Sequence, residues 1–190
     1  MRLRRRISQV FWRFSRWTPV TEEIPERGVL LGVPHTSNWD LLFMLMISWR
    51  IGKPFHFLAK KSLFRRPMGA VMRALGGIPV DRSAEQGLVR EIVAKAERGE
   101  QFLLVVTPEA TRGRVEYWKS GFYRIARAAE LPVVMGFVDS RRKECGLGPH
   151  FTLTGNVRAD MDRIRANYAG MIGVRPDMSG EPRLREEPEA

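Results

Sequence analysis

Hydrophobic residues at the start of the chain recur with the spacing of a helix. They lie three or four positions apart, at Leu3, Ile7, Val10, Phe14 and Trp17. Residues 1–17 also contain six arginines and no acidic residue. The pattern predicts an amphipathic helix over residues 1–20 that lies on a membrane surface, with its arginines toward the headgroups and its apolar face toward the acyl chains. A second interpretation stays open, in which the apolar face packs on the protein's own core.

From residue 28 onward, short apolar runs alternate with helical patterns. Strands are predicted at residues 28–33, 54–59, 78–80, 102–106, 133–138 and 151–154. Helices are predicted at residues 39–51, 63–75, 83–99, 120–130 and 161–171. This alternation predicts an α/β fold over residues 28–174, a layered domain with a mostly parallel central sheet flanked by helices. The Pro-, Gly- and Glu-containing segment 175–190 predicts a disordered tail.

Composition and charge narrow the class of protein. With 190 residues, 44% of them hydrophobic and 28% charged, the chain has the size and composition of one globular domain. Its net charge of +11 predicts an anionic partner, which charge alone leaves open among nucleic acid, an anionic membrane, acyl carrier protein and phosphorylated small molecules. The longest apolar run, residues 41–49, is too short to span a bilayer. We therefore expect no transmembrane anchor, and Arg13 and Arg16 argue against a signal peptide.

A histidine and an aspartate follow the first predicted strand at a spacing that suits a strand-to-helix turn. His35 comes just after the strand, and Asp40 lies in the first turn of the next helix. Such a turn lets the imidazole fold back onto the carboxylate, which would hold one ring nitrogen and leave the other free to accept a proton. This is the arrangement of a general base. Asp40 also has capping-box spacing from Ser37, so a purely structural role is an equally valid interpretation.

Other polar residues follow later predicted strands, where the sites of α/β folds gather. Two glycines allow a tight turn ahead of Arg82, which itself precedes a predicted helix start and so suits a phosphate. Glu109 and Arg112 follow the strand at 102–106, and Lys119 comes just before another helix. Taken singly, each is also compatible with an ordinary loop.

In this order, the segments resemble the glycerolipid acyltransferase superfamily, whose best-known members acylate lysophosphatidic acid. The resemblance covers about residues 28–140. Its first motif, a histidine, four residues and an aspartate, is matched by His35 and Asp40. Its later motifs are a glycine-rich segment that ends in arginine, a Pro-Glu-Gly-Thr-Arg run and a proline before an apolar strand. They are matched at Gly77, Arg82, Pro108, Glu109, Thr111, Arg112 and Pro132.

The resemblance implies an O-acyltransferase with His35 as catalytic base and Asp40 as its partner. The acyl donor would be acyl-CoA or acyl carrier protein, with no cofactor and no metal. The acceptor would be the hydroxyl of a lysophospholipid similar to lysophosphatidic acid, with Arg82 and Arg112 as candidates for its phosphate. The implied substrate-binding residues are Gly77, Arg82, Glu109, Thr111, Arg112, Lys119 and Pro132.

Two positions depart from the pattern of that superfamily, and both fall in its third motif. Thr107 replaces an aromatic residue and Ala110 replaces a glycine. If this glycine has a positive φ, alanine is strained there by roughly 1 kcal/mol. The identity of the acceptor therefore stays open, with an ornithine-derived lipid or a glycolipid as alternatives.

Two interpretations from other classes compete with an enzyme. A basic nucleic-acid-binding domain is supported by charge alone, and the sequence has no motif that combines basic and aromatic residues for that purpose. The other is a non-catalytic protein on a membrane surface, in which His35 and Asp40 only shape the helix start. We expect an enzyme in the cytoplasm, peripheral at the inner face of the membrane, that does not bind nucleic acid.

Overall fold

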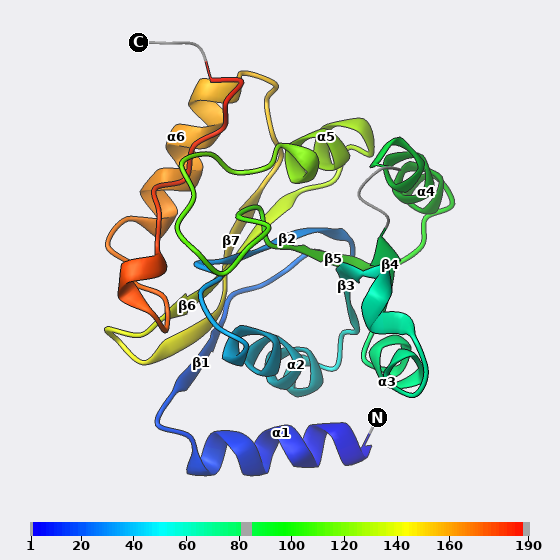
Figure 1. Cartoon of the computed structure of the whole chain (residues 1–190), viewed down its shortest axis with the longest axis vertical. Coiled ribbons are helices and arrows are strands. Elements are labelled where there is room, and N and C mark those ends of the chain that lie inside the picture. Colours follow the sequence, from blue (N-terminus) through cyan, green and yellow to red (C-terminus); the bar gives the residue numbers. More distant parts are fainter. Residues whose placement is uncertain (1, 81–84, 188–190) are drawn as a thin grey trace.

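A seven-stranded sheet forms the centre of the computed structural model, which describes residues 2–80 and 85–187 (Figure 1). The strand order is β1-β7-β6-β2-β5-β3-β4. The strands are β1 (Thr18–Thr21), β2 (Gly28–Val33), β3 (Phe55–Lys60), β4 (Gly77–Val80), β5 (Leu103–Val106), β6 (Val133–Asp139) and β7 (Glu144–Phe151). Neighbouring strands are parallel except β6 and β7. The predicted α/β fold with a mostly parallel sheet is confirmed.

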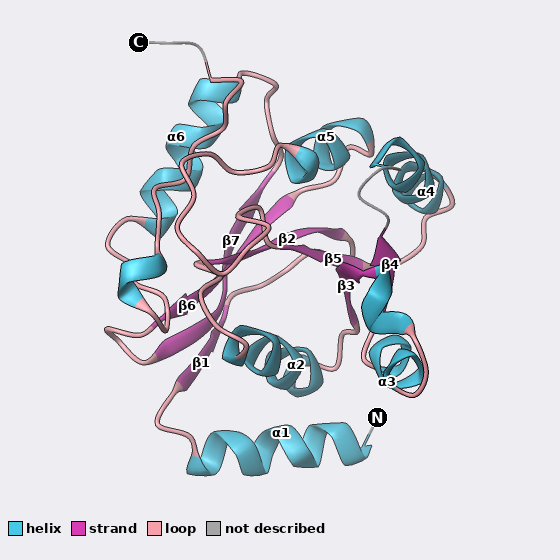
Figure 2. Ribbon diagram, viewed as in Figure 1, coloured by secondary structure: helices cyan, strands magenta, loops and turns pink. Residues whose placement is uncertain are grey.

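Helices cover both faces of this sheet (Figure 2). One layer consists of α1 (Arg2–Phe14), α2 (Trp39–Ile51), the 3₁₀ turn η1 (Lys61–Phe64) and α3 (Met68–Ala74). The opposite layer consists of α4 (Glu85–Glu97), α5 (Gly121–Ala128) and α6 (Val157–Tyr168). Each layer packs its own hydrophobic cluster on the sheet, so strands such as β2 are buried on both faces and read as continuous apolar runs.

Several element boundaries differ from the sequence prediction. The helix predicted over 63–75 is divided into η1 and α3, because the residue before Pro67 is disfavoured from helical geometry. Strand β1 was not predicted, and the strand predicted at residues 151–154 is wrong except for its first residue. The strand there is β7, whose two glycines and proline weaken its strand signal. One of those glycines, Gly146, is needed because an added Cβ would lie 1.7 Å from the Val20 carbonyl oxygen on β1. The last helix begins at Val157 instead of residue 161.

Helix α1 packs on α2 through a face that the sequence pattern did not single out. Ser8 and Trp12 are buried there, and the Ser8 hydroxyl donates to the Met46 carbonyl oxygen at 2.7 Å. The predicted apolar stripe lies on the other side of the helix and is exposed by 44 to 80%, at Leu3, Ile7, Val10 and Phe14. Only its last member, Trp17, packs inward, against Phe43. The interpretation in which the stripe fills the core is therefore wrong for four of its five residues.

The segment after α6 differs from the predicted disordered tail. It contains the short 3₁₀ turn η2 (Pro176–Met178) and continues along the domain as far as the structure describes it. Leu184 is only 2% exposed and forms a parallel bridge with Trp118. Arg165 of α6 pairs with Glu187 at 2.8 Å. Composition did not predict that this segment is ordered, because its order depends on a few contacts with the rest of the domain.

Candidate active site

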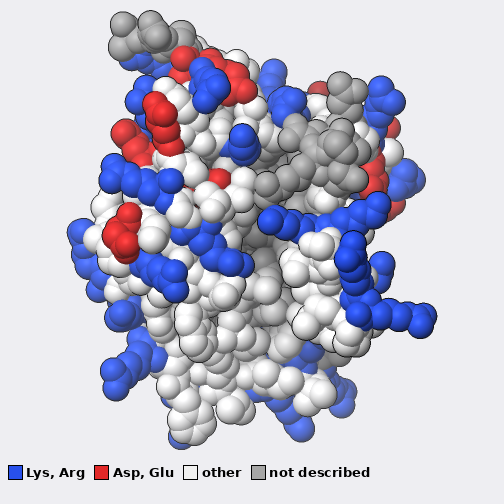
Figure 3. Space-filling model, viewed as in Figure 1, with Lys and Arg blue, Asp and Glu red and all other residues white. Residues whose placement is uncertain are grey.

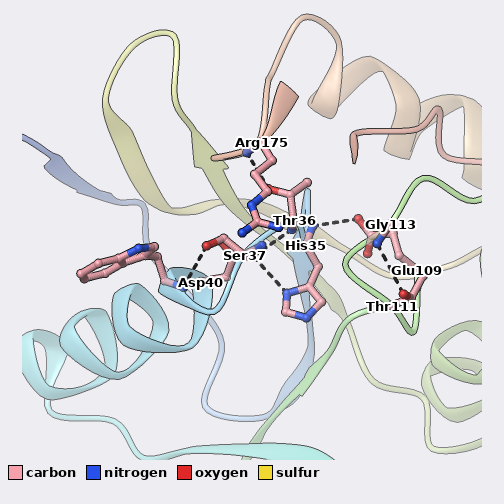
Figure 4. A network of polar contacts seen from close by, with 9 residues as sticks. His35, Thr36, Ser37, Asp40, Glu109, Thr111, Gly113 and Arg175 are labelled. Atoms are coloured by element: carbon pink, nitrogen blue, oxygen red, sulfur yellow. Dashed lines mark hydrogen bonds and ion pairs between the residues drawn. The ribbon is translucent and has the colours of Figure 1, made fainter. Parts of the chain in front are cut away.

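The turn between β2 and α2 brings His35 and Asp40 together. The Nδ1 atom of His35 lies 3.1 Å from Oδ2 of Asp40, although the two are not aligned as a hydrogen bond (Figure 4). The same carboxylate oxygen accepts the backbone N–H groups of Thr36 and Ser37, each at 2.9 Å. Asp40 therefore fixes the turn and contacts the imidazole at once, so the structural and the chemical interpretations of this residue do not exclude each other.

Burial gives the two nitrogens of the His35 ring different surroundings. Nδ1 is buried against Asp40, while the side chain as a whole remains 19% exposed. The carboxylate favours a proton on Nδ1, which leaves Nε2 as the nitrogen with a free lone pair. The turn follows the carboxyl end of β2, a central strand of the sheet, which is where parallel α/β folds place their ligands. The arrangement can take a proton from a group that approaches Nε2.

A second carboxylate, from the loop after β5, holds the backbone of the histidine. Oε1 of Glu109 accepts the His35 N–H at 2.9 Å, and Oε2 is buried without a partner among the described residues. Burial raises the pKa of Glu109, and the hydrogen bond from the His35 N–H lowers it by a smaller amount. The sequence placed Glu109 in the site but gave no signal for this contact, because a bond to a backbone N–H leaves no residue pattern.

Comparison with known proteins decides the family. A family model described as Acyltransferase matches residues 19–135, more than half of the chain. The chain belongs to the Acyltransferase family. A crystal structure of the 1-acyl-sn-glycerophosphate (LPA) acyltransferase PlsC from Thermotoga maritima is similar, with a TM-score of 0.54 and 18% identity over 86% of this chain and 75% of that one. At that identity the likeness shows a shared fold.

Two other comparisons add nothing to this assignment. A sugar kinase structure from Janibacter sp. HTCC2649 aligns over 85% of this chain and 86% of its own with 14% identity and a TM-score of 0.27, which is too low to carry an argument. No curated protein matches the sequence of this chain.

The Pro-Glu-Ala-Thr-Arg motif after β5 belongs to a largely exposed loop beside the turn that carries His35. Its Ala110 has a φ of +55°, so the family's glycine is replaced at a position that does adopt the left-handed conformation. Thr111, Arg112 and Lys119 are exposed on this loop, and the Lys119 N–H donates to the Pro108 carbonyl oxygen at 2.8 Å. The predicted residues Glu109, Thr111, Arg112 and Lys119 therefore lie on one segment, and of these four only Glu109 contacts the turn that carries His35 in the described contacts.

Two other predicted site residues are not brought to the turn. Pro132 precedes β6 at the amino end of the parallel strands, whereas His35 follows β2 at their carboxyl end. Gly77 begins β4, where a Cβ would lie 2.8 Å from the Met72 carbonyl oxygen, so close packing accounts for the glycine. Arg82 lies outside the described residues.

The segment after α6 supports the turn that carries His35 from its other side, and the sequence did not predict this. Thr36 is 1% exposed, and its Oγ1 accepts the Arg175 N–H at 3.1 Å (Figure 4). Gly173 lies against the same side chain, because a Cβ there would be 2.6 Å from Thr36. Ser140 holds the segment by donating its hydroxyl to the Gly173 carbonyl oxygen at 2.8 Å. The residues that provide this support, Ser140, Gly173 and Arg175, lie beyond residue 135, where the family match ends.

Neither a metal site nor a membrane-spanning helix is found in the part of the chain that the structure describes. His, Cys, Asp and Glu form no group of three or more there that could hold a metal ion. Among the same residues, each helix is too short or too polar to cross a bilayer.

Proposed function

We propose that the protein transfers a fatty acyl group from a thioester donor to a hydroxyl of a lysophospholipid, with His35 as general base. The observation that carries the proposal is the contact between His35 Nδ1 and Asp40 Oδ2, on a turn that belongs to an acyltransferase domain. The donor would be acyl-CoA or acyl carrier protein. The acceptor class follows from the name of the similar Thermotoga maritima protein, which acts on an acyl-glycerophosphate.

The proposed reaction is a direct transfer without a covalent enzyme intermediate. Nε2 of His35 accepts the hydroxyl proton while the hydroxyl oxygen attacks the thioester carbonyl carbon. The resulting tetrahedral oxyanion collapses, the carbon–sulfur bond breaks, and the leaving thiolate takes the proton back from the imidazolium. The products are an ester and a free thiol, so atoms and charge balance. Asp40 stabilises the imidazolium that forms in between.

Supporting contacts make the turn a rigid platform for this chemistry. Asp40 holds two N–H groups of the turn, Glu109 holds the His35 N–H, and Thr36 is fixed by the Arg175 N–H. A preorganised base keeps the reacting groups in position, which a mobile side chain would not do. Arg112 and Lys119 are exposed cations on the neighbouring loop and are our candidates for contacting the phosphate of the acceptor.

Helix α1 would hold the enzyme on the cytoplasmic face of an anionic membrane. Its four exposed apolar residues give a hydrophobic face, and six arginines in residues 1–17 provide attraction to anionic headgroups. Each basic residue near such a surface contributes about 1 kcal/mol of binding free energy. Peripheral attachment would place the site beside substrates that reside in the membrane.

The test is transfer from labelled acyl-CoA and from labelled acyl carrier protein to a panel of acceptors. The panel contains lysophosphatidic acid, other lysophospholipids, a lysolipid derived from ornithine and a glycolipid. We expect product with lysophosphatidic acid, and none with His35→Ala. Product with a different acceptor alone would retain the acyltransferase and overturn the acceptor assignment. Absence of transfer from both donors to every acceptor would overturn the proposed function.

A further inference from the structure

The positive charge of the chain is concentrated in one layer of the fold. Residues 2–21 and 41–80 contain thirteen of the 32 basic residues and none of the 21 acidic ones, so the remainder of the chain is close to neutral. These two segments form α1, α3 and nearly all of α2, together with η1, β1, β3 and β4. The lower part of the molecule, where α1, α2 and α3 lie, shows basic side chains and no acidic ones in Figure 3.

Exposed hydrophobic side chains gather in the same layer. Each large hydrophobic residue that is exposed among the described residues belongs to α1, to η1 or α3, or to the first position of α2. The residues outside α1 are Trp39, Leu63, Met68 and Val71, with exposed fractions between 46 and 58%. Scattered exposed hydrophobic residues are normal, but a set concentrated in the layer that carries the excess positive charge marks an interaction surface.

We propose that η1 and α3 form a second contact with the anionic bilayer, in addition to α1. The contact, which we call the η1–α3 patch, combines apolar Leu63, Met68 and Val71 with basic Lys61, Arg65 and Arg66. This combination of insertion-competent side chains and flanking cations is the chemistry of an interfacial segment. The inference rests on the membrane attachment included in the proposed function and extends it to a part of the fold that the sequence pattern did not indicate.

Direct contacts tie the η1–α3 patch to α1. The guanidinium of Arg4 donates to the Ala74 carbonyl oxygen of α3 at 3.0 Å and lies over the Trp49 ring of α2. Figure 1 shows the amino-terminal end of α1 beside α3. Because the two helices are joined in this way, a bilayer that binds α1 lies close to α3. Two separated contacts fix the orientation of the protein on a membrane surface, whereas a single helix allows the protein to rotate about the helix axis.

Most cations of this layer have no acidic partner in the part of the chain that the structure describes. Of the thirteen, only Lys53 forms an ion pair within the described residues, with Glu26 at 2.8 Å. Lys61, Arg65 and Arg73 line an open pocket of about 390 Å³ between η1 and β4, together with Phe64 and Pro79. Such a pocket suits a lipid headgroup, because the cations can bind its phosphate and the apolar residues can contact the adjoining glycerol carbons. An acidic protein would satisfy the charges, but it gives no reason for apolar residues on α1 and α3 together, so we favour the bilayer.

Site-specific fluorescence tests this contact on the full chain. The native Cys145 is completely buried, and burial raises its pKa to about 12, so an introduced surface cysteine can be labelled selectively. An environment-sensitive dye would be attached in turn to Val71→Cys, Val10→Cys and Arg90→Cys, the last an exposed position on α4 in the opposite layer. With vesicles of phosphatidylcholine and phosphatidylglycerol, we expect a blue shift at positions 71 and 10 and none at position 90.

The outcomes separate this inference from the proposed attachment itself. A shift at position 10 without one at position 71 would overturn the second contact and leave α1 as the membrane helix. No shift at either position would overturn membrane attachment as well, while the acyl-transfer assay would still test the chemistry. A shift at position 71 that appears without lipid and grows with protein concentration would assign the η1–α3 patch to a second copy. A shift with acyl carrier protein alone would assign it to an acidic protein.

A charge-matched pair of variants provides a second test. The triple variant Lys61→Gln, Arg65→Gln, Arg66→Gln removes three cations from the η1–α3 patch. The control Arg90→Gln, Arg141→Gln, Arg158→Gln removes three exposed cations elsewhere, so both lose the same net charge. We expect the first to weaken vesicle binding about fivefold for each charge that contacts the surface, and the control to have little effect. Equal losses would mean that net charge alone acts, and would overturn the assignment.

Discussion

Glu109 holds His35 by its backbone, because the Glu109 Oε1 atom accepts the His35 N–H at 2.9 Å. The bond joins the loop after β5 to the turn after β2 across 74 positions of the sequence. A carboxylate of the motif after β5 thus has a structural partner inside the turn that carries His35. Its second oxygen is buried without a partner among the described residues.

Replacing Glu109 separates a positioning role from a role of its charge. Glu109→Gln keeps a carbonyl oxygen for the His35 N–H, so we expect kcat to change little. Glu109→Ala leaves that N–H unsatisfied and should cost about 1–3 kcal/mol of stability together with much of the activity. Assays of both variants alongside their melting curves check this. A large loss of activity in Glu109→Gln with normal stability would show that the charge itself acts on substrate.

The raised pKa of Glu109 predicts a pH-dependent contribution to stability. Because its folded-state pKa lies above the ordinary value of 4.5, this contribution is fully present below that value and is lost as pH rises through the raised value. The dependence should vanish in Glu109→Gln, which cannot ionise. Urea unfolding of both proteins from about pH 4 to pH 8 gives the difference. A constant difference between the two across this range would contradict the raised pKa.

His35→Ala tests the proposed base. Loss of a general base typically lowers the rate about 10²–10⁴-fold, and the fold should be retained because the side chain is partly exposed on a turn. His150→Ala is the matched control, since His150 is exposed on β7 and takes no part in the described site. Steady-state rates per folded molecule, with circular dichroism of each variant, provide the measurement. Near-normal turnover in folded His35→Ala would remove the assignment.

Asp40→Asn distinguishes the charge of this residue from its role in the turn. The amide oxygen can still accept the N–H groups of Thr36 and Ser37, so the turn should persist with a small change in melting temperature. It cannot stabilise an imidazolium as a carboxylate does, so kcat should fall by about 10²–10⁴. Asp40→Ala should lose both activity and stability. Retained activity in Asp40→Asn would leave Asp40 with the structural role alone.

Ala110→Gly should relieve backbone strain next to the site. At a φ of +55°, alanine pays a cost that glycine avoids, so the free energy of unfolding should rise by up to about 1 kcal/mol. Glu130→Gly, at a φ of +50° on the far side of α5, is the control for strain relief without proximity to the site. Urea titrations measure both. If Ala110→Gly also changes the preferred acceptor while Glu130→Gly does not, the loop conformation takes part in acceptor choice.

The sequence predicted what depends on local pattern and missed what depends on distant contact. The alternation of apolar runs and helical spacing predicted the parallel sheet, and the interval between His35 and Asp40 predicted their approach. The glycine-containing β7 carries no comparable local signal, and its place in the sheet comes from pairing with β6 and β1. For α1, periodicity located the apolar stripe, but only tertiary packing through Ser8 and Trp12 shows which side faces outward.

The bond from Arg175 to Thr36 spans 139 positions, so the turn that carries His35 has all of its contacts only when nearly the whole domain has folded. During synthesis, β2 can pair with β5 and β6 before the segment after α6 has left the ribosome. Such a partly made protein would hold His35 on a turn that is supported from one side only. The protein would therefore become active late in folding, when nearly the whole domain is formed. Proteolytic cleavage near Gly173 should accordingly abolish acyl transfer while most of the secondary structure is retained.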